Sequence, residues 1–306
     1  MRELTIAGHR IADDTDAFIV AEISGNHMGS VETAKEIMDA AAWCGVDAVK
    51  LQKRDLPTWE ALDPDAWHAS YNSEHAFGPT YGEHRAALEF GLDEYRELQG
   101  HAEGKGLIFF ATAFDVPSLH FLTDLGVPAI KLASASIVNL PLIEGAAWKG
   151  LPVIASTGGA TPVEIEAAWR TYHRAIAPWG PSRLALLQCT ALYPCPAQHL
   201  QLGVISRLRA EYPETVIGLS DHQAGIAMAP VAYNLGARII EKHFTLHRTW
   251  KGSDQAFSLE PEGMRRMVRD LRRTRLALGD GVKRRLDDEV PALVKMGRRD
   301  LLGVAV

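Results

Sequence analysis

The chain has 306 residues, of which 47% are hydrophobic and 23% are charged. This composition is typical of a globular protein with a large core, and it excludes disordered, collagen-like and fibrous proteins. The 32 lysine and arginine residues and the 38 aspartate and glutamate residues give a formal net charge of −6. Without a basic surplus to neutralise a phosphate backbone, no nucleic-acid partner is expected.

The N-terminal sequence MRELTIAGHRIADD lacks the apolar run of a secretory signal, and no stretch of about 18 apolar residues follows it. These absences predict a cytoplasmic protein that has no membrane as a partner. Cys44, Cys189 and Cys195 have neither the paired spacing of a zinc ribbon nor the density of a disulfide scaffold, so we expect reduced thiols.

Short apolar runs alternate along the chain with longer amphipathic segments, and this alternation predicts a parallel sheet covered by helices. The segment 30–45 is typical of these helices, because Ser30 can cap its start and Gly45 can end it. The segment 161–175 follows the same pattern. The apolar runs lie at 17–23, 46–52, 107–112, 128–134, 152–157, 183–189, 215–220 and 237–244.

Eight such units in a chain of this length predict an α/β protein with a closed (β/α)8 TIM barrel rather than an open doubly wound sheet. We expect one barrel domain over residues 1–280 and a short tail over 281–306 that packs on the barrel or on a partner. The long segment 53–91 is expected to be an active-site loop. The basic run 265–275 has helical spacing and predicts a solvated outer face.

The polar residues that end the strands of such a barrel gather around one mouth, so they are the first candidates for chemistry. Among them, Lys50 and Lys131 stand inside apolar runs and need a negative partner, because burial removes the hydration of an ammonium group. A structural ion pair with Glu22 or Glu241 would supply that partner, and so would a bound anion. Hydroxyl groups at other strand ends favour the anion, although each can also cap a turn: Thr112, Ser134, Ser156 and Ser220.

His222 and His243 are separated by about one β-α unit, which predicts that they lie on neighbouring strand ends. Two imidazoles in this arrangement can share a divalent metal ion, with water or substrate as the remaining ligands. Each can instead be an ordinary hydrogen-bonded histidine. Tyr193 lies in the proline-stiffened loop 190–196, from which its ring can contact a substrate or simply pack.

Taken together, the strings VAEISGNHMGS, VKLQ, ATAF, IKLASAS, ASTGG, QCTALYPCP, GLSDH, EKHFTL and GSDQAFSLEPEG resemble the sialic acid synthase family in sequence and in order. The resemblance runs from about residue 17 to about residue 300. It implies a barrel enzyme, dependent on Mn²⁺ or Mg²⁺, that condenses phosphoenolpyruvate with N-acetylmannosamine or a similar aldose. The products would be a sialic-acid-like 2-keto-3-deoxy sugar acid and phosphate.

The resemblance also implies roles for individual residues. Glu22, His222 and His243 would be catalytic, and the two histidines would hold the metal ion. Phosphoenolpyruvate would contact Lys50, Thr112, Lys131, Ser134, Ser156 and Ser220. The sugar would contact Gln52, Phe114, Tyr193 and Asp254, together with Glu22.

The chain departs from the family pattern in three ways. Ala191 stands where the family usually has an asparagine that contacts phosphoenolpyruvate, and Ser136 stands where it usually has a glutamate that binds the sugar. In the family, an antifreeze-like domain typically follows the barrel and completes the partner subunit's sugar site, and we expect this chain to lack it. Either a separate lid protein replaces it, or the segments 53–91 and 298–306 cover the mouth. A homodimer is expected by resemblance.

Two other functions are compatible with these residues. Lys131 or Lys50 would be the nucleophile of a Schiff-base pyruvate aldolase if its pKa were depressed, although such an enzyme has no need for the histidine pair. The departures at Ala191 and Ser136 also allow a non-catalytic barrel that binds a metabolite. Against this second alternative, buried charged groups are costly to keep once their ligand is lost.

Overall fold

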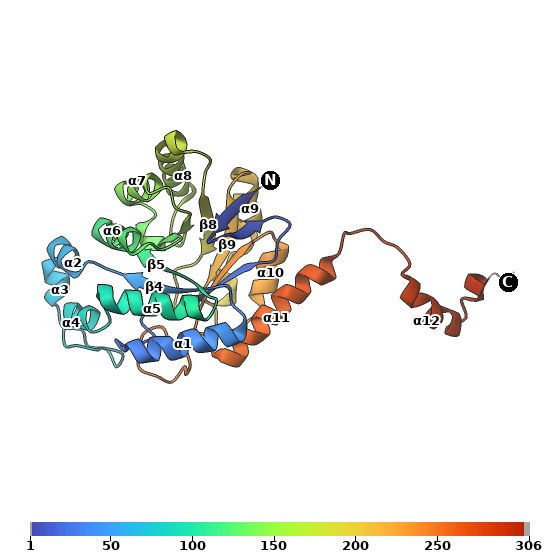
Figure 1. Ribbon diagram of the computed structural model, residues 1–306, viewed down its shortest axis with the longest axis horizontal. Coiled ribbons are helices and arrows are strands. Elements are labelled where there is room, and N and C mark those ends of the chain that lie inside the picture. The colour runs from blue at the N-terminus through green and yellow to red at the C-terminus, as the bar shows by residue number, and fades with distance from the viewer. Residues whose placement is uncertain (1, 303–306) are drawn as a thin grey trace. The chain divides into compact units, whose positions relative to one another are not determined.

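The computed structural model describes residues 2–302 and contains the predicted barrel (Figure 1). Eight parallel strands close in the order β10-β3-β4-β5-β6-β7-β8-β9. The (β/α)8 prediction is therefore confirmed, with one strand overlapping each apolar run. The strands are β3 (Phe18–Glu22), β4 (Ala48–Lys53), β5 (Ile108–Ala113), β6 (Ile130–Leu132), β7 (Val153–Ser156), β8 (Leu184–Cys189), β9 (Val216–Asp221) and β10 (Ile239–His243).

Helices surround the strands and present their apolar sides to them. As predicted, the Ser30 side chain accepts a hydrogen bond from the Thr33 amide at the start of α1, and Gly45 ends this helix with a left-handed φ of 80°. The outer helices are α1 (Val31–Cys44), α5 (Leu92–Gly104), α6 (Val116–Leu125), α7 (Leu140–Trp148), α8 (Pro162–Ile176), α9 (Gly203–Glu211), α10 (Met228–Asn234) and α11 (Pro261–Leu278).

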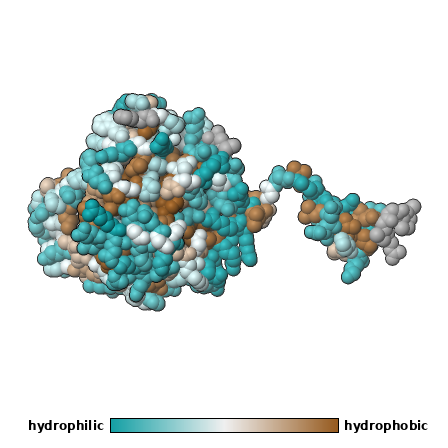
Figure 2. Space-filling view, in the orientation of Figure 1, coloured by the Kyte–Doolittle hydropathy of each residue, from teal (hydrophilic) through white to brown (hydrophobic). Residues whose placement is uncertain are grey.

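The outward faces of these helices are polar. Figure 2 shows that hydrophilic side chains predominate over α1 and α5. In the basic run of α11, Arg265 and Arg266 pair with the exposed Glu262, whereas Met264 and Met267 are buried. The expectation of a solvated basic face is confirmed. Within the described chain, no helix has the length and apolar character needed to cross a bilayer.

An antiparallel hairpin, β1 (Glu3–Ile6) and β2 (His9–Ala12), precedes the barrel. No strand was predicted there, although the apolar residues alternate with polar ones as in a half-buried strand. Leu4, Ile6 and Ile11 are nevertheless buried in the main hydrophobic cluster. Residues of β1 also line a depression together with Pro128 and Pro152, which precede β6 and β7. The hairpin thus packs at the amino-terminal end of the barrel, opposite the strand ends that carry the candidate residues.

The segment 53–91 is more regular than the expected loop. It contains the short helices α2 (Leu56–Leu62), α3 (Pro64–His68) and α4 (Tyr81–Ala86). An Asp55 side chain caps α2, and a reciprocal capping box between Thr80 and Glu83 starts α4. This local order gives the segment a defined position on the barrel.

The chain divides into two compact units, Met1–Arg272 and Arg273–Val306. The division falls inside α11 rather than at the expected residue 280. The described part of the second unit includes α12 (Val290–Lys295), and none of the side chains of this helix is buried. The proposed cover by residues 298–306 falls partly outside the described residues.

Candidate active site

A cavity of about 560 Å³ lies at the carboxyl ends of the barrel strands. The register of neighbouring strands sets Glu22 beside His243 and Lys50, and Thr112 beside Lys131. Every residue predicted for the site lines this cavity: Glu22, Lys50, Gln52, Thr112, Phe114, Lys131, Ser134, Ser156, Tyr193, Ser220, His222, His243 and Asp254. The sequence therefore predicted which side chains meet, while their chemical roles stay predictions.

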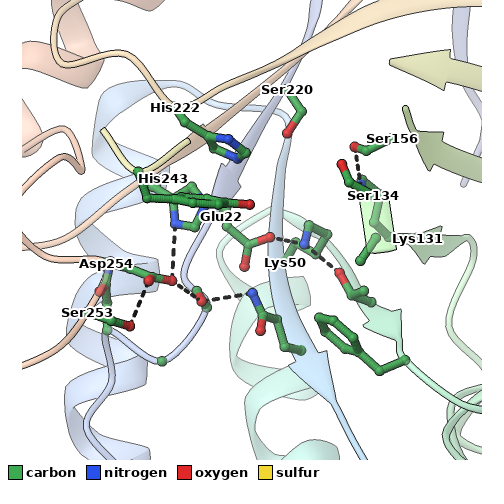
Figure 3. Close-up of a pocket in the computed structure, with 18 of the residues that line it drawn as sticks. Glu22, Lys50, Lys131, Ser134, Ser156, Ser220, His222, His243, Ser253 and Asp254 are labelled. Carbon is green, nitrogen blue, oxygen red and sulfur yellow. Dashed lines mark hydrogen bonds and ion pairs between the residues drawn. The ribbon is translucent and has the colours of Figure 1, made fainter. Parts of the chain in front are cut away.

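Lys50 and Lys131, the two lysines predicted for the site, are both buried, and Figure 3 shows their positions. Lys50 forms an ion pair with Glu22, and its Nζ donates a hydrogen bond of 2.7 Å to Thr112 Oγ1. Lys131 Nζ donates a hydrogen bond of 2.7 Å to Ser156 Oγ. Each ammonium group is thus held by a hydroxyl on the next strand, with its charge directed at the cavity.

Glu241 provides a second buried carboxylate between the lysines. Its oxygens lie 3.9 Å from Lys50 Nζ and 3.7 Å from Lys131 Nζ, and Ser220 Oγ donates a hydrogen bond of 2.8 Å to it. Burial alone would raise the pKa of Glu241, but the charges of Lys131 and Lys50 outweigh burial and lower this pKa to about 2. Both ion-pair partners considered from the sequence are therefore present. Glu22 and Glu241 thus interact with the same lysines to which an anion would bind.

The pKa of Lys50 departs strongly from its ordinary value. Burial lowers the pKa of Lys50 to about 7, with the charge of Glu241 opposing this shift. A bound dianion would favour the protonated ammonium form. The charge at this position therefore responds to what the cavity holds.

The hydroxyl groups at the strand ends both contact protein groups and line the cavity. Those of Thr112, Ser156 and Ser220 contact the charged cluster, as described above. Ser134 begins a short 3₁₀ turn and accepts a hydrogen bond of 3.0 Å from the Gly158 amide. All four also line the cavity, so they are placed to contact a ligand oxygen as well as to hold the protein.

The two histidine rings lie with their centroids 5.4 Å apart. His222 Nδ1 is bonded to the Thr190 carbonyl at 2.9 Å, which leaves its other ring nitrogen for a ligand. His243 Nδ1 is buried and makes no hydrogen bond in the described structure, although Asp254 approaches it to 3.6 Å. Burial lowers the pKa of His243 to about 3, so its imidazole is neutral, as a metal ligand must be.

These donors fit a divalent cation. Neutral imidazoles suit first-row divalent ions, and Glu22 Oε1 is a further buried oxygen without a hydrogen-bond partner. The described residues contain no cluster of three or more histidine, cysteine, aspartate or glutamate side chains arranged as a complete ligand set. The remaining positions on an ion held by His222 and His243 would thus belong to water or substrate.

The predicted sugar-facing residues form the other wall of the cavity. Gln52 Nε2 donates to Ser24 Oγ at 2.8 Å, and Ser24 in turn donates to Asp254 at 2.5 Å. Tyr193 is half-exposed, and its ring centroid lies 4.1 Å from that of His222, with the two rings tilted by 33°. This wall carries hydrogen-bonding groups and an aromatic surface, which is a combination that suits a polyhydroxylated ring.

Several lining residues were missed from the sequence. Ser24 and Arg54 each lie two residues from a predicted site residue, so the two-residue period of a strand was a usable signal for them. Glu241 was considered only as an ion-pair partner of the lysines, and it lines the cavity as well. Arg85 comes from α4, and no local pattern indicated it. Of the two departures from the family pattern, Ala191 lines the cavity, whereas Ser136 is buried beside it.

Comparisons with known proteins agree with the geometry. Residues 37–283 match the model of the NeuB family. The N-acetylneuraminate-9-phosphate synthase of Homo sapiens is 38% identical over 291 residues, which are 95% of this chain and 79% of that protein. The N,N'-diacetyllegionaminic acid synthase of Legionella pneumophila is 36% identical over 295 residues, which are 93% of this chain and 81% of that protein.

Comparison with solved structures also finds sugar acid synthases with the same barrel fold. A crystal structure of an N-acetylneuraminic acid synthetase from Leptospira borgpetersenii, in complex with citrate, superposes with a TM-score of 0.81 at 33% identity and covers 99% of this chain and 98% of that one. A 3-deoxy-D-arabino-heptulosonate 7-phosphate synthase from Thermotoga maritima shares the barrel fold at 16% identity, with a TM-score of 0.66. The chain therefore belongs to the NeuB, or sialic acid synthase, family of sugar acid synthases.

Proposed function

We propose that this enzyme condenses phosphoenolpyruvate with an N-acetylmannosamine-like aldose to give a 2-keto-3-deoxy sugar acid and inorganic phosphate. One observation carries the proposal: two buried lysines and the imidazoles of His222 and His243 line one cavity at the barrel mouth. The first group suits a small polyanion, and the second suits a metal-assisted carbonyl reaction.

Phosphoenolpyruvate matches the lysine side of the cavity. Its phosphate carries about −1.5 to −2 charges, and its carboxylate adds another. Lys50 and Lys131 would exchange part of their contact with Glu22 and Glu241 for these oxygens. The strand-end hydroxyls are placed to donate to the same groups.

The aldose would lie on the opposite wall, against Gln52, Phe114, Tyr193 and Asp254. Mn²⁺ or Mg²⁺, when bound by His222 and His243, would supply polarisation of the aldehyde oxygen. In the reaction, C3 of phosphoenolpyruvate forms a bond to the aldehyde carbon, and the oxygen of a water molecule adds to C2. The C2–O bond to phosphate then breaks, and the keto acid and phosphate leave.

Glu22 lies between the two walls and contacts Lys50. An ammonium partner lowers the basicity of a carboxylate, so Glu22 is better suited to orient water or a sugar hydroxyl than to remove a proton from a weak acid. Its second oxygen is buried without a partner and is available for this contact.

The direct test is phosphate release from phosphoenolpyruvate with Mn²⁺ and a panel of aldoses that includes N-acetylmannosamine and its 6-phosphate. We expect stoichiometric phosphate and a 2-keto acid, with activity lost in EDTA and restored by Mn²⁺. Absence of release with every aldose would reject the proposed reaction, and tight binding of phosphoenolpyruvate without turnover would favour a non-catalytic metabolite-binding barrel.

One observation favours a second candidate, a Schiff-base pyruvate aldolase. The lowered pKa of Lys50, about 7, is the property that a nucleophilic lysine requires. Treatment with pyruvate and borohydride would then add a reduced pyruvyl group to Lys50. The proposed condensation predicts no such adduct, because its carbon nucleophile is phosphoenolpyruvate itself.

A further inference from the structure

Two arginine side chains line the candidate cavity beyond the lysine and histidine groups. Arg54 follows β4, and Arg85 lies on α4. Within the described residues, neither guanidinium forms an ion pair with a carboxylate. The proposed condensation assigns no role to either residue.

Arg54 is 9% exposed, and its Nε is buried without a hydrogen-bond partner. Its guanidinium stacks 3.6 Å from the centre of the Phe114 ring, and Nη1 donates to Gln52 Oε1 at 3.1 Å. The nearby carboxylate of Glu89 pairs with Lys53 instead and accepts only the backbone amide of Arg54. A buried guanidinium in this state retains donors for a further anion.

Arg85 adds a second positive charge to the same part of the cavity. It is half-buried, and its Nε donates to Tyr81 Oη at 2.9 Å. Burial lowers the pKa of Arg54 to about 10, with repulsion from Arg85 as the next contribution, so the two guanidiniums are close enough to disfavour each other. Lys251 stands nearby with its Nζ 4.9 Å from the ring centre of Phe77, which also lines the cavity.

A continuous chain of polar contacts connects Arg54 to His243. It runs from Arg54 to Gln52, then to Ser24, to Asp254 and finally to His243. A sugar lying along this chain, with its aldehyde at the imidazoles, would direct its far end at the guanidiniums. Asp254 is the carboxylate on this path, and its contacts are with Ser24, Ser253 and His243.

We propose that Arg54 and Arg85 bind the phosphate of an aldose phosphate, so that the sugar substrate is phosphorylated at the end far from its aldehyde. This inference rests on the proposed condensation. Two guanidiniums facing one end of a ligand match a phosphate dianion, which can accept several charge-assisted hydrogen bonds. An uncharged hydroxymethyl group at this end would leave the repulsion between the arginines uncompensated.

The test compares N-acetylmannosamine with N-acetylmannosamine 6-phosphate in the full-length enzyme with Mn²⁺ and phosphoenolpyruvate. We expect the wild type to favour the phosphorylated sugar in kcat/KM. Arg85→Gln and Arg54→Gln should each reduce this preference at least tenfold. Arg96→Gln, a substitution of an exposed arginine on α5, should leave both the preference and the activity unchanged. An unaltered preference in Arg85→Gln, in a folded protein that still releases phosphate, overturns the phosphate site.

Calorimetric binding of N-acetylmannosamine 6-phosphate separates this inference from the reaction itself. Arg85→Gln should weaken the binding of this ligand at least tenfold. It should weaken the binding of phosphoenolpyruvate much less, because phosphoenolpyruvate contacts the lysine side. If this pattern is found but no aldose supports phosphate release, the site stands and the condensation fails. If phosphate is released while Arg85→Gln weakens the binding of both ligands equally, the condensation stands and the separate phosphate site is rejected.

Discussion

At the scale of single residues, the site is governed by charges that the barrel interior forces together. Lys50 and Lys131 are compensated by Glu22 and Glu241, so the charges of this four-residue cluster balance. An incoming anion must therefore compete with carboxylates that belong to the protein. This competition makes the charge state of the cluster a measurable reporter of ligand binding.

Glu22→Gln tests the carboxylate nearest to both walls of the cavity. The amide keeps the shape of the side chain but loses the charge that pairs with Lys50, and it orients water poorly. We expect turnover to fall about 100-fold, which is within the range of a positioned acid-base or orienting group. The measurement is kcat for phosphate release, with circular dichroism as the control for folding. Near-normal activity would remove Glu22 from the mechanism.

The lowered pKa of Lys50 predicts that the protein takes up a proton when phosphoenolpyruvate binds. A pKa of about 7 leaves Lys50 mostly deprotonated at about pH 8, and a bound dianion raises this pKa, so binding draws a proton from solution. Affinity for phosphoenolpyruvate should accordingly weaken as the pH rises above about 7. Calorimetry in two buffers with different ionisation enthalpies detects the uptake.

The control for this experiment is Lys50→Arg, because a guanidinium keeps its charge throughout this pH range. The variant should bind phosphoenolpyruvate with the same heat in both buffers. Equal heats of binding in the two buffers for the wild-type enzyme would contradict proton uptake by Lys50.

At the scale of elements, the segment 53–91 determines what stands over the mouth. It is built from short helices with their own caps, and α4 carries Arg85. The close approach of Gly82 to Trp67 joins α4 to α3. A Cβ atom at Gly82 would lie 2.4 Å from Trp67 Nε1.

Gly82→Ala should therefore displace α4 while leaving the barrel strands in place. We expect KM for the aldose to rise about tenfold, or about 1.4 kcal/mol, with a much smaller change for phosphoenolpyruvate. Gly100→Ala on α5 is the matched control, since its Cβ would meet no atom within 4 Å and alanine favours the helix. Equal effects on both substrates would show that α4 does not act on the sugar side alone.

At the scale of the whole molecule, closure of the barrel brings the first and last strands together and so joins Glu22 to His243. Gly218 on β9 lies one strand away from this closure, between Leu187 of β8 and Ile239 of β10. A Cβ atom there would stand 2.5 Å from the Ile239 carbonyl oxygen and 2.4 Å from Leu187. Backbone at this position cannot move without opening the sheet.

Gly218→Ala is expected to destabilise the protein by about 3 kcal/mol, as overpacking of a rigid core does. Thermal or urea unfolding of residues 1–306 measures the effect, with Gly203→Ala, whose Cβ would meet nothing within 4 Å, as the control. If the unfolding free energies of the wild type and of Gly218→Ala agree within error, the strands around β9 tolerate the extra atom.

The sequence by itself determined the barrel and the membership of its mouth. Apolar runs at regular intervals specify parallel strands, and every strand in a barrel points its carboxyl end the same way, so polar residues at the ends of runs must meet. The charge-bearing candidates Glu22, Lys50, Lys131, His222 and His243 were found for this reason, whereas Asp254 was proposed from the family resemblance.

Only the tertiary structure decided the contacts that no local period encodes. Examples are the position of Glu241 between two lysines, the link from Arg54 to His243, and the placement of Arg85 by α4. The hairpin β1–β2 belongs here too, because a short alternating segment becomes a strand only when it finds a core to cover. These features depend on distances between residues far apart in the chain, and folding alone sets those distances.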